Sequence, residues 1–186
     1  MRTSFSSPAP LGGGRVMSEE SEAGVSAAAF AAMAGSLNAV WYEQLALCDM
    51  LEALADGLPD RADRGMCLEA AEAISGLLAR AHRLEESVLF ANIARYYGRC
   101  PGLSQIISRL RHDHIADQAY AEELHDALTA HGRGLAKPSA ETLGYMLRAF
   151  FENIRRHIRF DMEVLLPLLT SGEPDVSADK INRSGI

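Results

Sequence analysis

Four segments of this chain place an apolar residue at every third or fourth position, and this spacing constrains the fold more than any other feature. It is the spacing of an amphipathic helix with one buried face, here called its apolar seam. The segments span residues 36–56, 60–97, 103–131 and 139–171, with glycine and proline between them. Strand-like alternation of apolar and polar residues is absent from the sequence. The sequence therefore predicts an all-α protein, an antiparallel up-down-up-down four-helix bundle.

The predicted bundle occupies residues 26–171, and both ends of the chain differ from it in composition. Residues 1–25 are rich in serine, glycine and proline and are expected to be a disordered tail, and residues 172–186 are expected to be a flexible one. The alanine-rich start of the bundle predicts a short helix. Gly35 is expected to break that helix, and Ser36 is expected to cap the next one.

Composition narrows the possible functions. The chain has 186 residues and a net charge of −7, without a basic face of the kind that binds nucleic acid. It has no run of about 20 apolar residues that would span a membrane, and no apolar leader segment, so we expect a cytoplasmic protein. The three cysteines are an odd number without metal-binding spacing, which argues against a disulfide framework. A nucleophile–base arrangement and a glycine-rich phosphate loop are both missing, so we do not expect an enzyme.

Ionisable residues interrupt three of the four seams near their middles. They are Glu85 in the second segment, His114 and Asp117 in the third, and His157 and Asp161 in the fourth. A single buried histidine–aspartate pair would be explained by a structural hydrogen bond. Five such groups from three helices would be costly to bury unless a cation bound them together. Donors of this kind suit iron, manganese or zinc, and two histidines with carboxylates are a common non-haem iron environment.

The segments that carry these residues resemble the hemerythrin-like (HHE cation-binding) family. The matching segments are HRLEESVLF (82–90), RHDHIAD (111–117) and HIRFDMEVLLP (157–167), within a resemblance that covers about residues 36–170. The resemblance implies a four-helix bundle with a non-haem di-iron centre that binds oxygen or senses oxygen, nitric oxide or redox state. The family motif takes a histidine from the first helix, His-x-x-x-Glu from the second, a histidine from the third, and His-x-x-x-Glu or His-x-x-x-Asp from the fourth.

The chain departs from this motif at two positions. Counting along the seams places Trp41 and Ala81 where the resemblance implies histidines that serve one of the two irons. We therefore predict a site that holds one metal ion, with Trp41 filling the volume of the missing ion and packing against Ala81. His82 and Glu86 lie about 100° around the helix from the seam. They are additional candidate ligands, because a modest rotation of this helix would bring both into the site.

Two functions stay open on the sequence. One is a metal-binding protein, with iron as the expected metal, that responds to oxygen or redox state and has dioxygen or another small redox ligand as its partner. A lone iron lacks the neighbour that two-electron dioxygen binding requires, so we expect a sensor or a structural metal site and not an oxygen carrier. The other is a metal-free regulatory bundle, derived from the hemerythrin fold, that binds a protein partner.

Overall fold

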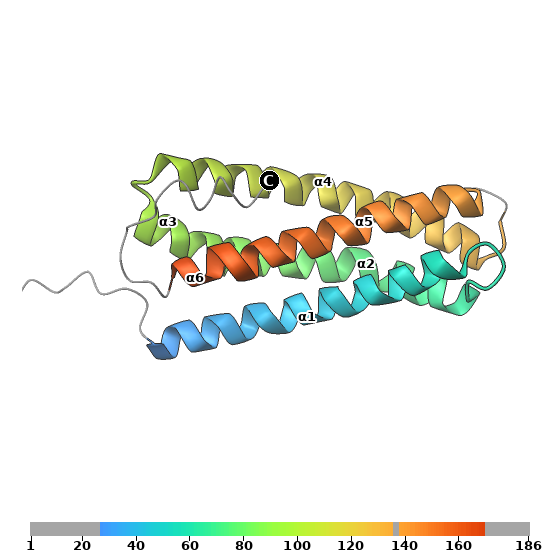
Figure 1. Cartoon of the computed structure of the whole chain (residues 1–186), viewed down its shortest axis with the longest axis horizontal. Helices are drawn as coiled ribbons and strands as arrows, with labels where there is room; N and C mark the ends of the chain where they lie inside the picture. Colours follow the sequence, from blue (N-terminus) through green and yellow to red (C-terminus); the bar gives the residue numbers. More distant parts are fainter. Residues whose placement is uncertain (1–26, 136–137, 170–186) are drawn as a thin grey trace, which may run out of the picture.

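The computed structural model describes residues 27–135 and 138–169, and these residues form an antiparallel four-helix bundle (Figure 1). Its elements are α1 (Ala27–Gly57), α2 (Arg64–Leu84), η1 (Glu85–Phe90), α3 (Ala91–Tyr97), α4 (Pro101–Gly132), α5 (Ala140–Phe160), η2 (Asp161–Leu165) and α6 (Leu166–Leu168). Within the described residues there is no strand. The predicted all-α bundle is therefore confirmed, while the predicted tails at 1–25 and 172–186 lie outside the described residues.

The described bundle consists of four rods, each a continuous run of helix, and two of these rods are made of several helical elements. Elements α2, η1 and α3 follow one another without a break and form the second rod, and α5, η2 and α6 form the fourth. Both η1 and η2 are short π-helical segments, in which a turn holds about one residue more than in an α-helix. Helices α1 and α4 each lie beside α2 and α5, so every rod has two neighbours.

Helix α1 is continuous across Gly35, so the predicted break at this residue is wrong. A glycine inside a helix costs only about 1 kcal/mol relative to alanine. The neighbouring side chains of Met33 and Leu37 are buried in the core, and their burial offsets that cost. Ser36 does not cap a helix, because its hydroxyl donates to the carbonyl of Ala32 one turn earlier, at 3.1 Å.

Side-chain caps fix where later rods begin. Asp63 accepts hydrogen bonds from the backbone N–H groups of Gly65 at 2.7 Å and Met66 at 3.1 Å. Helix α2 therefore begins at Arg64, about one turn later than predicted. Ser139 caps α5 in the same way, at the position where the sequence predicts the fourth helix to begin.

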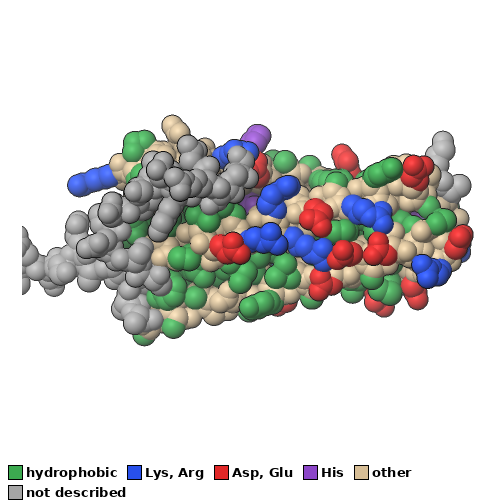
Figure 2. Space-filling model, viewed as in Figure 1, with side chains coloured by type: hydrophobic (Ala, Val, Ile, Leu, Met, Phe, Trp, Pro, Cys, Tyr) green, Lys and Arg blue, Asp and Glu red, His purple; other side chains and the backbone are tan. Residues whose placement is uncertain are grey.

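The core is apolar along most of its length. Fully buried side chains come from every rod and include Leu37, Leu51, Ile74, Leu89, Leu103, Leu124, Leu143 and Leu165. At the surface, Arg155 of α5 joins α1 by hydrogen bonds to Asp49 at 2.7 Å and Glu52 at 2.6 Å. Figure 2 shows acidic and basic side chains interspersed on the face in view. Among the described residues, every helix is too short or too polar to span a lipid bilayer.

Candidate metal centre

Both composite rods change from α to π geometry at a buried carboxylate. Segment η1 begins at Glu85 and η2 begins at Asp161, and both side chains are fully buried. The extra residue in a π turn shifts the helical phase, so a carboxylate can face the core while the apolar residues after it stay buried. Segments of this kind occur frequently at functional sites. They mark the level of the bundle at which the polar residues meet.

Four side chains from three rods converge at this level. Nε2 of His114 lies 3.2 Å from Oε2 of Glu85 and 3.3 Å from Nε2 of His157. Nε2 of His157 lies 3.6 Å from Oε2 of Glu85 and 3.6 Å from Oδ2 of Asp161. Donor atoms that share one ion at about 2.0–2.2 Å lie roughly 2.8–3.6 Å apart in octahedral or tetrahedral geometry. These four separations fall in that range. Possible ligand atoms within 4.8 Å of one another form two sets, Glu85 with His157 and Asp161, and Glu85 with His82 and His114, so Glu85 is common to both.

Unpartnered atoms also indicate a cation. Oε2 of Glu85 and both carboxylate oxygens of Asp161 are buried without an aligned hydrogen-bond partner among the described residues. Histidine nitrogens lie within ion-pair reach of Oε2 of Glu85, at 3.2 Å, and of Oδ2 of Asp161, at 3.6 Å, but neither contact has the geometry of a hydrogen bond. Unpaired buried charges cost several kcal/mol and are rare. The facing Nε2 atoms of His114 and His157 repel each other unless a proton or a cation lies between them.

The site favours positive charge at its centre. Burial alone would raise the pKa of Glu85, but polar contacts with His114 and His157 lower it below its usual range. Burial opposes a charged His157 ring, yet Asp161 and Glu85 raise its pKa well above the ordinary value. Burial raises the pKa of Asp161, against the attraction of His157. Without a metal, a proton on His157 therefore takes the place that a cation would fill.

The sequence profile of the hemerythrin HHE cation binding domain matches residues 43–169. The chain belongs to this family. Comparisons with curated proteins and with solved structures gave no match. All four converging residues lie inside the matched region, whereas Trp41 lies just before it. The family and the donor geometry agree that this hemerythrin-like bundle is a cation-binding protein.

Trp41 is the contact that α1 makes with this centre. Its side chain is fully buried, and its indole Nε1–H donates a hydrogen bond of 2.6 Å to Oε1 of Glu85. An indole nitrogen has no lone pair to offer a metal. Ala81, on the rod that carries Glu85, is also fully buried. Trp41 therefore occupies one oxygen of Glu85 and leaves the other, Oε2, facing the two histidines.

His82 lies within the core, although seam counting placed it about 100° away. Its ring stacks on that of His114, with centroids 3.9 Å apart and planes within 4° of parallel. His82, Glu85 and His114 bring possible ligand atoms within 4.8 Å of one another. Parallel rings cannot both aim a nitrogen at one ion, however, because each lone pair lies in the plane of its own ring. Burial and the neighbouring His114 lower the pKa of His82 to about 3, so this ring is neutral.

Glu86 contacts the site from outside. Its Oε1 accepts a hydrogen bond from Nδ1 of His114 at 2.8 Å, and its other oxygen lies 4.0 Å from Arg111. Because a carboxylate only accepts, this bond holds a proton on Nδ1 and leaves Nε2 of His114 free to bind. A carboxylate behind a metal-binding histidine orients the ring and makes it a better ligand. Glu86 is therefore placed to orient a ligand and not to be one.

Asp117 lies outside both sets of potential ligands among the described residues, whereas the sequence had placed it with the other four. It follows His114 by one turn of α4, and its Oδ1 accepts a hydrogen bond of 2.7 Å from the side-chain amide of Asn153 on α5. Its Oδ2 is buried and has no hydrogen-bond partner in the described part of the chain. Asn153 thus provides a hydrogen-bond donor for one oxygen of the Asp117 carboxylate, and the other oxygen has no partner among the described residues.

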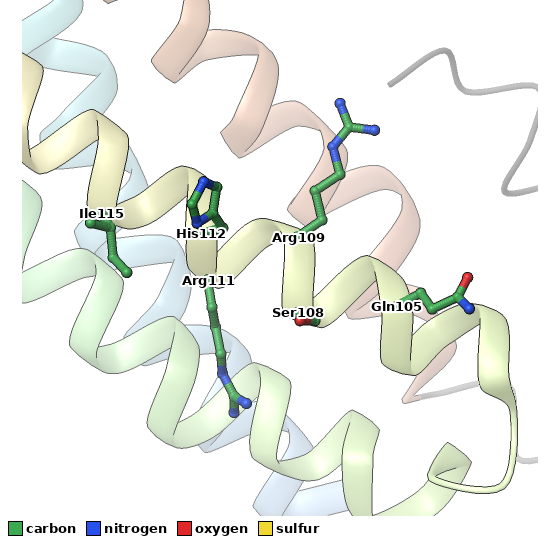
Figure 3. Close-up of a pocket in the computed structure, with 6 residues that line it drawn as sticks. All are labelled: Gln105, Ser108, Arg109, Arg111, His112 and Ile115. Atoms are coloured by element: carbon green, nitrogen blue, oxygen red, sulfur yellow. The ribbon is translucent and has the colours of Figure 1, made fainter.

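The hollow drawn in Figure 3 lies away from this centre. It measures about 600 Å³ and sits on the outer face of α4. Its lining residues are Gln105, Ser108, Arg109, Arg111, His112 and Ile115. Arg111 extends from this face toward the neighbouring helix, and none of the four converging side chains lines the hollow. The hollow is therefore a feature of the surface and not the opening of the metal centre.

Proposed function

We propose that this hemerythrin-like protein binds one iron ion through Glu85, His114, His157 and Asp161 and responds to oxygen or to redox state. The observation that carries this proposal is the hydrogen bond from Trp41 to Oε1 of Glu85. It leaves one free carboxylate oxygen at the point where two histidine nitrogens meet. Two imidazole nitrogens with two carboxylate oxygens are a common donor set for non-haem iron.

Two features support one ion over two. Glu85 is common to both sets of potential ligands, and the hydrogen bond from the indole N–H of Trp41 would make its Oε1 a weaker ligand for a second ion. A second ion would also need a nitrogen from His82, whose ring is stacked on His114. Neither Trp41 nor Ala81 can supply the nitrogen ligands that the resemblance implies at their positions.

The enclosure of the site suits a small signal molecule. When bound, an iron ion supplies one-electron redox chemistry. Phe90 packs beside His114 at a ring-centroid distance of 5.4 Å, and the carboxylates of Glu85 and Asp161 are fully buried. These contacts exclude water from the donors, while Glu86 keeps His114 in the orientation that binding requires. We propose dioxygen or another small redox molecule as the signal.

Metal analysis of full-length protein, purified without a histidine tag from iron-rich medium, tests this proposal. We expect about one iron per chain in the unmodified protein and none in His157→Ala. His112→Ala is the matched control, because that histidine is exposed on the surface of α4, and it should retain its iron. Trp41→His combined with Ala81→His should raise the stoichiometry toward two. Two irons in the unmodified protein, or none, would contradict the proposal.

A metal-free regulatory bundle is the second candidate, and one observation favours it. Nε2 of His157 lies 3.6 Å from an oxygen of Glu85 and 3.6 Å from an oxygen of Asp161. A protonated His157 would hold both carboxylates together without a metal. Such a protein would act through a protein partner at its surface. Absence of iron, manganese and zinc after expression with each metal would support this candidate over the first.

A further inference from the structure

The metal centre is least enclosed where α4 faces α5. Of the neighbouring rods in the described chain, these two pack least closely. His157, on α5, is also the most exposed of the four converging side chains, at 10% against 3% or less for the other three. An ion that enters without unfolding the bundle therefore meets the least resistance between α4 and α5.

Two carboxylates follow one another along the flank of α4 that faces α5. Asp113 is half-exposed, with 42% of its side chain accessible, and Asp117 lies one turn later with 7% exposure. The hydrogen bond between Asp117 and Asn153 shows that this flank faces α5. The opposite flank faces η1, because Arg111 pairs there with Glu86. Two carboxylates thus lead from solvent into the interface between α4 and α5, and the outer one, Asp113, lies 3.9 Å from Nε of Arg109.

Asp117 offers a free binding atom at the inner end of this line. Its Oδ1 is held by the amide of Asn153 at 2.7 Å, and Asn153 is held in turn by Nη2 of Arg156 at 3.1 Å. Its Oδ2 is buried and has no hydrogen-bond partner within the described residues. A buried carboxylate oxygen without a partner is costly. A cation in transit would be such a partner.

We propose that divalent cations enter between α4 and α5, and that Asp117 is a transit ligand whose Oδ2 binds the ion before His157 does. This inference rests on the proposed function, since it needs the cation site, and it adds a kinetic role for a residue outside that site. Asn153 is only partly buried, so its side chain can swing aside as an ion passes.

A second hollow, between α1 and α2, can be compared with the proposed entry between α4 and α5. It measures about 430 Å³ and is lined in part by Glu43 and Arg80, which form an ion pair. On that side of the bundle, Trp41 already occupies Oε1 of Glu85. Glu43 is therefore a carboxylate near a hollow but without a free buried oxygen leading to the site.

Stopped-flow binding of Co²⁺ to metal-free, full-length protein tests the proposal, with quenching of Trp41, the single tryptophan, as the signal. Co²⁺ is a divalent probe suited to nitrogen and carboxylate donors. Asp117→Asn keeps the shape of the side chain and removes its charge. We expect about tenfold slower uptake and about tenfold slower release, so that the equilibrium dissociation constant changes by less than about twofold. Equal slowing in both directions identifies a transit ligand, because it acts on the barrier and not on the bound state.

Two further variants complete the test. Glu43→Gln is the matched control and should leave both rates unchanged. Asn153→Leu places an apolar side chain in the entry and should slow both rates, which keeps the test decisive if Asp117→Asn folds poorly.

Three results would overturn the inference. Unchanged rates in Asp117→Asn and Asn153→Leu would place the entry elsewhere. Faster release with unchanged uptake in Asp117→Asn would make Asp117 a resident ligand. Failure of the unmodified protein to bind any Co²⁺ would refute the proposed function and this inference with it, and is distinct from either kinetic result.

Discussion

Trp41→Phe tests the hydrogen bond from Trp41 to Oε1 of Glu85, which leaves only Oε2 facing the two histidines. The change removes the Nε1–H donor, which lies 2.6 Å from Oε1, and keeps an aromatic ring in the core. A hydrogen bond to a charged group contributes about 1.5–3 kcal/mol, and here its loss leaves a buried acceptor without a donor. The smaller ring adds about 1 kcal/mol through the cavity it leaves. We expect the metal-free protein to lose about 2.5–4 kcal/mol of unfolding free energy.

Urea unfolding followed by circular dichroism measures this loss, because the variant has no tryptophan to report by fluorescence. Tyr42→Phe is the matched control, since Tyr42 is the next residue and is 62% exposed, and it should change stability by less than about 0.5 kcal/mol. A double-mutant cycle with Glu85→Ala, which removes the acceptor, should give a coupling energy of about 1.5–3 kcal/mol. Additive effects in this cycle, or a loss below about 1 kcal/mol in Trp41→Phe, would refute the reasoning, because Oε1 would then have found another donor.

Four further predictions concern the ligands and the bundle. Glu86→Gln should weaken Co²⁺ binding about 10- to 100-fold, because the carboxylate that orients His114 is lost. An equilibrium titration measures this loss, and an unchanged dissociation constant would exclude the orienting role of Glu86. Burial opposes a proton on His157, but Asp161 and Glu85 raise its pKa well above the ordinary value. Because a cation must displace this proton, cation binding should release about one proton, and the affinity for the cation should rise with pH. Calorimetry in buffers of different ionisation enthalpy measures that proton, and its absence would contradict the assignment. In the metal-free protein the same raised pKa stabilises the fold below the ordinary histidine pKa, and this contribution is lost as pH rises through the folded value. Arg155→Ala should cost about 1 kcal/mol in urea unfolding at low salt and less at about 1 M salt, since it removes the contacts with Asp49 and Glu52. Arg156→Ala, its control, should cost less than about 0.5 kcal/mol, and equal losses in the two variants would argue against the α1–α5 contact.

Apolar spacing predicts the rods because a buried helix face leaves a regular signature over many residues. Leu103, Leu110 and Leu124 recur at whole heptads on α4, and all three are buried. Single residues that favour or oppose a helix are weaker signals. Gly35 lies inside α1 because the packing of its neighbours outweighs a local cost of about 1 kcal/mol.

The residues of the metal centre can be predicted from the sequence only where each helix keeps a regular number of residues per turn. Seam counting places Ala81 in the core, where it is fully buried, but it does not show that the next residue, His82, is buried as well. His82 lies near the end of α2, just before the π-helical η1 interrupts the regular α-helical spacing. Asp117 lies on the seam as predicted, but spacing cannot reveal that Asn153 on another helix binds it. The bond from Trp41 to Glu85 is hidden from the sequence for the same reason.

The central claim is that Trp41 restricts the site to one ion. Electron paramagnetic resonance of the oxidised, iron-loaded protein tests this claim most directly. A single high-spin ferric ion is paramagnetic, whereas two strongly coupled ferric ions that share a bridging ligand give no signal. We expect a ferric signal that integrates to about one spin per chain, with about one iron by elemental analysis. A silent sample that contains about two irons per chain would contradict the claim and would make His82 and Glu86 the first residues to test as ligands of a second ion.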